Sequence, residues 1–151
     1  MQFSDMPIVD ATRNHNKDGN YFSEKANGFL AALNIPMFVS KKDAVEFIES
    51  FDPTIDALVQ SMEESGAAYS TETILLFGST LGEAFRIVFG GQWHFSEKQE
   101  RWVVVCKMKD GSDIEMNIFL KTEKRIVNGM EDSVTYYFQL TKKMIDGERL
   151  Q

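Results

Sequence analysis

The sequence of 151 residues contains a single cysteine, Cys106, which excludes an internal disulfide framework. No run of apolar residues approaches the length of about 18 that is needed to cross a bilayer. The N-terminus has neither the basic residues nor the apolar run of a secretory signal. These absences predict a cytoplasmic protein that has no membrane segment.

Basic residues are scarce in the first half of the chain. Residues 1–66 contain 11 acidic and 5 basic residues, whereas residues 67–151 contain 12 and 11, and the net charge is −7. Binding to the phosphate backbone requires a basic face, so this distribution argues against a nucleic-acid partner. It favours a basic protein as partner.

Histidine is also rare, since His15 and His94 are the only two. A zinc site would need both of them together with carboxylates or Cys106, and no local ligand spacing supports this. Cys106 stands in the middle of a predicted strand, on its apolar face, where a thiol usually serves as a small buried side chain. We therefore predict no metal, no cofactor and no catalytic constellation.

The length is typical of one domain, and the hydrophobic fraction of 43% is enough for a sizeable core. We expect residues 1–20 to be irregular and residues 21–89 to be mostly helical. Apolar spacing predicts a helix over 21–34 and another that begins at Lys41, where Ser40 and Asp43 resemble a capping box. Asp52-Pro53 then predicts the start of a second helix or a kinked continuation, which Gly66 ends.

The stretch "LFGSTLGEAFRIVFGGQWHF", residues 76–95, has apolar residues at helical spacing and then a pair of glycines. It predicts a helix that starts near Ser70–Thr73, stops at Gly90, and leads into a strand. Gly78 and Gly82 are one turn apart, and their spacing matches no nucleotide-binding pattern. Close packing against another element is the interpretation we prefer for them, and a ligand cleft is the alternative.

Residues 92–121 are predicted to form a three-stranded antiparallel meander. The register of its second hairpin follows from the apolar pattern, which favours a three-residue loop, 109–111, over a two-residue Asp110-Gly111 turn. This loop places Val104 opposite Met116 and Cys106 opposite Ile114, and it extends the pairing to Trp102 and Ile118.

The tail, residues 131–146, has apolar residues that fit either a strand or a helix. A cap at Asp132 or Ser133 and the lysines at 142 and 143 favour a helix. The predicted fold is therefore a single α+β domain, in which N-terminal helices and a C-terminal helix pack on a three-stranded antiparallel meander.

The helical region from 43 to 64 contains seven acidic residues and no basic one. Such a face is often only a solvated surface, but a surface of one sign can also steer a basic partner toward it. Our leading hypothesis is a non-enzymatic protein-binding module. Its predicted contact residues are Glu46, Glu49, Asp52 and Asp56.

Two other hypotheses remain open. The first is a small-ligand or enzymatic site in a cleft beside the glycine pair, formed by Gly78, Gly82, Glu83 and His94. The second is a structural protein that associates with itself as a homodimer.

Two segments, "LGEAFRIVFGGQW" at 81–93 and "KRIVNGMEDSVTYYFQL" at 124–140, show a resemblance that covers roughly residues 70–145. They resemble a group of small bacterial cytoplasmic domains in which a Leu-Gly-Glu helix ends at Gly-Gly-x-Trp and an Asn-Gly-x-x-Asp-Ser segment opens the last helix. Some members look like immunity proteins that neutralise toxins. The resemblance implies a helical tail and an inhibitor of a basic toxin, and it carries no catalytic residue to this chain.

Overall fold

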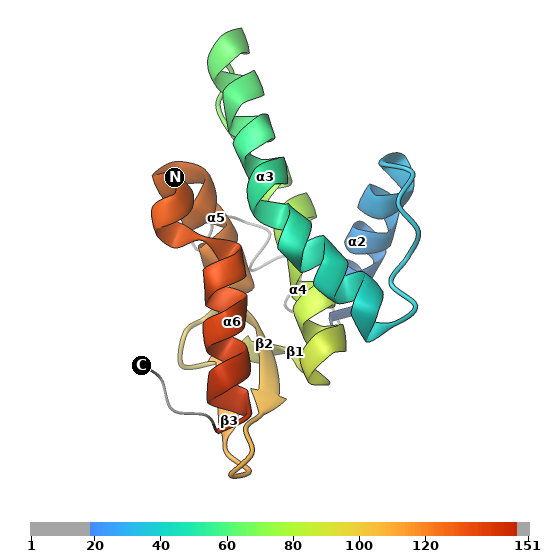
Figure 1. Cartoon of the computed structure of the whole chain (residues 1–151), viewed down its shortest axis with the longest axis vertical. Coiled ribbons are helices and arrows are strands. Elements are labelled where there is room, and N and C mark those ends of the chain that lie inside the picture. The colour runs from blue at the N-terminus through green and yellow to red at the C-terminus, as the bar shows by residue number, and fades with distance from the viewer. Residues whose placement is uncertain (1–18, 148–151) are drawn as a thin grey trace.

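The computed structural model describes residues 19–147, which form an α+β fold (Figure 1). Three helices come first, a three-stranded sheet follows, and two helices joined by a short 3₁₀ helix close the chain. The elements are α2 (Asn20–Ala32), α3 (Lys41–Ser65), α4 (Thr71–Phe89), β1 (Gln92–Ser96), β2 (Arg101–Lys107), β3 (Asp113–Met116), α5 (Ile118–Asn128), η3 (Gly129–Asp132) and α6 (Val134–Ile145). The predicted irregular segment, 1–20, lies outside the described residues except for its last two, where Asn20 already starts α2.

The sheet is the predicted antiparallel meander, with strand order β1-β2-β3. Val104 pairs with Met116 and Cys106 with Ile114, as the apolar pattern predicted. The hairpin closes through the three-residue loop, because the Met108 N–H donates to the Ser112 carbonyl at 2.7 Å. Gly111 has a φ of 89°, a left-handed conformation that glycine adopts without strain.

The predicted extension of the last strand to residue 121 is wrong. β3 ends at Met116 and α5 begins at Ile118, so the expected pair between Trp102 and Ile118 does not form. The side-chain oxygen of Asn117 accepts from the Leu120 N–H at 3.2 Å and caps the new helix. The cap follows β3 directly, and the buried residues after it are spaced as in a helix. The chain therefore starts a helix there instead of continuing the sheet.

Helix α3 runs through Pro53 as one element and changes direction near its middle (Figure 1). Proline has no N–H to donate to the preceding turn, which explains a bend at this position. The ends of α3 are as predicted: Ser40 accepts from the Asp43 N–H at 3.2 Å, and Gly66 has a left-handed φ of 73°. Asp52 does not cap a second helix within this segment, and its partners are described below.

Helix α4 is central to the packing, since it contacts α2, α3, α5 and the sheet. It begins at the predicted cap, Ser70, and ends at Gly90. The predicted C-terminal helix is confirmed as α6, with Ser133 rather than Asp132 as the cap that accepts from the Tyr136 N–H. Among residues 19–147, no helix has both the length and the apolar character required to span a bilayer.

Candidate functional site

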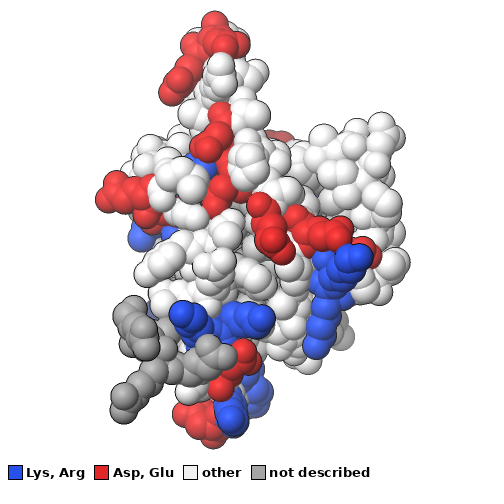
Figure 2. Space-filling model, viewed as in Figure 1, with Lys and Arg blue, Asp and Glu red and all other residues white. Residues whose placement is uncertain are grey.

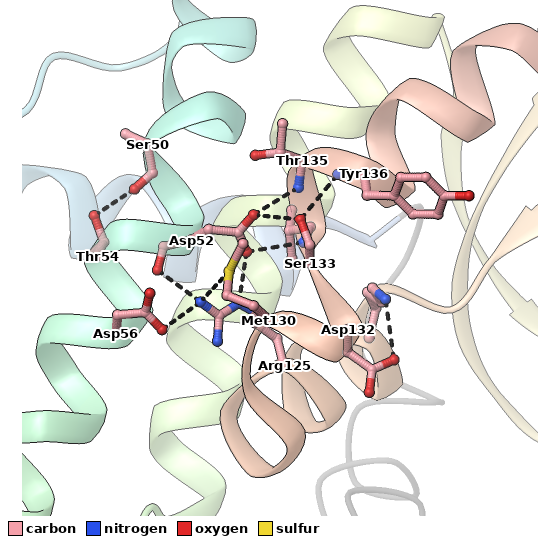
Figure 3. A network of polar contacts seen from close by, with 12 residues as sticks. Ser50, Asp52, Thr54, Asp56, Arg125, Met130, Asp132, Ser133, Thr135 and Tyr136 are labelled. Carbon is pink, nitrogen blue, oxygen red and sulfur yellow. Dashed lines mark hydrogen bonds and ion pairs between the residues drawn. The ribbon is translucent and has the colours of Figure 1, made fainter.

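Asp52 lies in the middle of α3, but its carboxylate caps a different helix, α6 (Figure 3). The backbone N–H groups of Val134 and Thr135 each donate to it at 3.0 Å, and the Ser133 hydroxyl donates at 2.8 Å. The first N–H groups of a helix have no partner within the helix and carry partial positive charge, so a carboxylate satisfies both needs. Asp52 is only 4% exposed, so little of this predicted contact residue is accessible at the surface.

Arg125 of α5 completes this network and is fully buried. Its Nε donates to Asp52 Oδ1 at 2.7 Å, and its Nη2 donates to Asp56 Oδ1 at 2.6 Å. Nη2 also donates to the backbone carbonyl of Asp52 at 3.1 Å. One arginine therefore compensates two carboxylates of α3. In the sequence, no basic residue lies near either of them.

Asp52 and Arg125 are both charged at neutral pH. Burial on its own would raise the pKa of Asp52, but hydrogen bonds from Val134, Thr135, Arg125 and Ser133 outweigh it and lower that pKa to about 2. Burial acts to lower the pKa of Arg125, and the two aspartates raise it above its ordinary value. The network thus holds α3, α5 and α6 together as a buried ionic cluster.

Two of the four predicted acidic residues, Glu46 and Glu49, remain on the surface of the N-terminal half of α3. Glu46 lies 4.0 Å from Lys42, and within the described part of the chain Glu49 has no ion pair or side-chain hydrogen bond. Asp56 is also exposed, with 56% of its side chain accessible, and it accepts from Arg125 at the same time. In Figure 2, acidic side chains follow α3 along its length, and basic ones lie at its start.

Beside Glu46, the connection from α2 to α3 exposes large apolar side chains. Leu33, Ile35, Met37 and Val39 alternate along this loop, and Val39 is 89% exposed. The loop and α3 enclose an open pocket of about 300 Å³. Its lining residues are Ile35, Pro36, Phe38, Asp43, Glu46, Phe47 and Ser50. An apolar patch beside exposed carboxylates is typical of a surface that binds another protein.

The glycine pair that suggested a ligand cleft is covered by aromatic rings. A methyl group at Gly82 would overlap the indole of Trp93, and one at Gly78 would lie 2.5 Å from Cδ1 of Phe119. These rings stack on each other with centroids 5.6 Å apart. The two glycines therefore allow the rings of Trp93 and Phe119 to pack closely against α4.

Glu83 is buried next to Gly82, and its carboxylate accepts hydrogen bonds from two side chains. Its Oε2 accepts from Trp93 Nε1 and from Arg86 Nε, both at 2.8 Å. Burial acts to raise the pKa of Glu83, and hydrogen bonds from Arg86, Trp93 and Ser23 together with the Arg86 charge lower it. A charged carboxylate with these hydrogen bonds holds the orientation of the Trp93 ring.

His94 lies on the opposite face of β1 from Trp93 and is exposed. It lines a separate open pocket of about 500 Å³, together with Lys107, Asp113 and Glu115. Lys107 pairs with Asp113 at 2.8 Å, and Glu115 accepts from Ser96 at 2.9 Å. The structure therefore does not bring Gly78, Gly82, Glu83 and His94 together at one site.

Cys106 is buried on the inner face of the sheet, and burial is the main cause that raises the pKa of its thiol, with the charge of Asp113 adding to it. Across residues 19–147, no three His, Cys, Asp or Glu side chains gather as metal ligands would. His15, considered as a zinc ligand, lies outside the described residues.

No protein-family model, no curated protein and no solved structure matches this chain. The resemblance to immunity-type domains therefore stays a prediction, and the surface geometry carries the functional argument.

The sequence pattern missed Arg125 and Ser133 as partners of Asp52, although a signal was present. Asp52 follows Ile48 by four residues and precedes Ile55 by three, and both are fully buried. A residue at these spacings faces the core of a helical protein. A carboxylate in that position needs a buried cation or N–H donors, which is what the fold supplies.

Proposed function

We propose that this protein is a non-enzymatic binding module for a basic protein partner. Its interaction surface comprises Glu46 and Glu49 on α3 together with the apolar loop at 33–39. Asp52 is buried, and both Asp52 and Asp56 are bound to Arg125, so we leave these two residues out of the proposed surface.

The observation that carries this proposal is the direct adjacency of exposed carboxylates and exposed apolar side chains. Glu46 lines the same pocket as Ile35 and Phe38. Carboxylates attract a basic partner over a distance and fix its orientation, whereas buried apolar area supplies most of the affinity. A solvated acidic face needs no apolar neighbour of this kind.

An immunity-type inhibitor of a basic toxin is the specific form of this function that we favour. It agrees with the net charge of −7 and with the resemblance of residues 70–145 to such domains. Acidic inhibitors of basic enzymes use long-range attraction to associate rapidly, and that attraction weakens with salt.

The experiment compares two double charge reversals on the same helix. Glu46→Lys with Glu49→Lys alters the proposed surface, and Glu63→Lys with Glu64→Lys applies the same change in charge at the far end of α3. Partners are captured from extracts of the source organism, identified, purified and titrated against each variant. Two reversals of partly exposed pairs should weaken binding by about 30-fold.

A basic partner that loses affinity only with the first double variant supports the proposal. A partner that is insensitive to it, or that responds equally to both, overturns it. Light scattering on the same samples tests the alternative of self-association, which like charges on this surface oppose.

A further inference from the structure

The pocket between the α2–α3 loop and α3 is lined by both apolar and acidic side chains. Ile35, Pro36, Phe38 and Phe47 make it apolar, and the rings of Phe38 and Phe47 lie 5.4 Å apart at 55°. Asp43 and Glu46 add two carboxylates to the same pocket. An occupant must therefore offer apolar length and a positive charge together.

Lysine and arginine side chains both meet these requirements, and arginine fits this pocket better. Its three methylene groups pack on apolar surface while its charged end stays within reach of carboxylates. Its planar guanidinium also stacks on aromatic rings and donates to two acceptors at once. A neutral apolar side chain would leave the carboxylates uncompensated, and an acidic one would be repelled.

We propose that this pocket receives an arginine side chain of the partner, with its stem against Phe38 and Phe47 and its guanidinium at Glu46 and Asp43. This inference rests on the proposed function and names the group that the surface recognises. Asp43 Oδ2 already accepts from the Val39 N–H at 3.1 Å, which anchors that carboxylate and leaves Oδ1 as an acceptor.

Two lysines lie near the pocket and partly offset its negative charge. Lys42 lies 4.0 Å from Glu46, and Lys41 is exposed in the same helical turn. The N-terminal end of α3 also carries partial positive charge, which Asp43 offsets. An incoming guanidinium therefore competes with Lys42 for Glu46, and removal of that lysine should strengthen binding.

The test uses a defined probe, the peptide acetyl-Gly-Leu-Arg-Leu-Gly-amide, titrated into the whole protein and followed through backbone amide NMR signals. Its twin carries citrulline in place of arginine, which keeps the shape and removes the charge. We expect saturable shifts confined to residues 33–50 and about tenfold weaker binding of the twin. Equal binding of the two peptides, no saturation, or shifts spread evenly along α3 would overturn the inference.

Three single variants sharpen the result. Glu46→Gln should weaken the arginine peptide by about fivefold, and Lys42→Gln should strengthen it. Glu63→Gln, the same change at an exposed position further along α3, should leave the affinity unchanged. An equal effect of Glu46→Gln and Glu63→Gln would mean that the probe senses net charge alone, and would also overturn the inference.

The outcome is separable from that of the proposed function. If the peptide fails to bind while a natural partner depends on Glu46 and Glu49, the arginine pocket is wrong and the function stands. If the peptide binds here while no partner depends on these residues, the pocket is supported and the function falls.

Discussion

Replacing Asp52 with asparagine removes the central acceptor of the buried cluster at almost constant volume. Asparagine keeps one acceptor oxygen but presents an amide donor where Val134, Thr135 or Ser133 must donate. It also leaves the buried Arg125 with Asp56 as its only carboxylate partner. The expected result is a large loss of stability without a cavity.

The magnitude follows from the structure in two ways. A pKa of about 2 in the folded chain, against an ordinary value of 3.8, corresponds to about 2.5 kcal/mol of stabilisation at neutral pH. Breaking a buried ion pair by removing one partner costs about 3–5 kcal/mol. Since Asp56 still compensates part of the Arg125 charge, we expect about 3 kcal/mol, a large share of the 5–15 kcal/mol typical of a domain.

Urea denaturation followed by tryptophan fluorescence and by helical circular dichroism measures this loss. Asp56→Asn is the matched control, because Asp56 makes a single contact with Arg125 from a side chain that is 56% exposed. That variant should lose about 1 kcal/mol. A loss below about 1 kcal/mol for Asp52→Asn, or equal losses for the two variants, would refute the assignment of Asp52 as the central acceptor.

The pH dependence provides a second check on the same residue. Because the folded state lowers the pKa of Asp52, its contribution is fully present above pH 3.8 and is lost as the pH falls toward about 2. The difference in unfolding free energy between wild type and Asp52→Asn should therefore shrink between about pH 4 and pH 2. A difference that stays constant over this range would contradict the linkage.

Three further predictions test the packing and the buried groups. Gly82→Ala should destabilise the fold by about 1–3 kcal/mol, because the added methyl group overlaps Trp93. Gly28→Ala changes a helical glycine with nothing within 4 Å and should stabilise the fold by about 0.5–1 kcal/mol, so losses of equal size in both variants would contradict close packing at Gly82. Glu83→Gln should cost about 1–2 kcal/mol, because it replaces a charged acceptor of Trp93 and Arg86, and an unchanged urea midpoint would show that the carboxylate contributes nothing. Cys106 should react with a thiol reagent at pH 8 only as fast as the protein unfolds, and fast reaction of the folded protein would show that the thiol is accessible.

Local chemistry explains which parts of the fold could be read from the sequence. Ser40, Ser70 and Gly90 act through partners within four residues, so their roles do not depend on the rest of the chain. The hairpin register also followed from the alternation of adjacent strands. The local pattern failed after Met116, where apolar residues fitted both a strand and a helix and only the Asn117 cap distinguished them.

The candidate site needed the tertiary structure. The sequence showed that α3 is acidic, but it did not show which of its carboxylates bind Arg125 and which do not. Asp52 meets Arg125 across 73 positions and Ser133 across 81, and no local pattern reports contacts of that separation. By itself, the sequence determined helices α2, α3, α4 and α6, the caps at Ser40 and Ser70, and the sign of the surface charge, since each of these depends on neighbouring residues. Only the packing of α5 and α6 against α3 decided which carboxylates of α3 bind Arg125 and which do not.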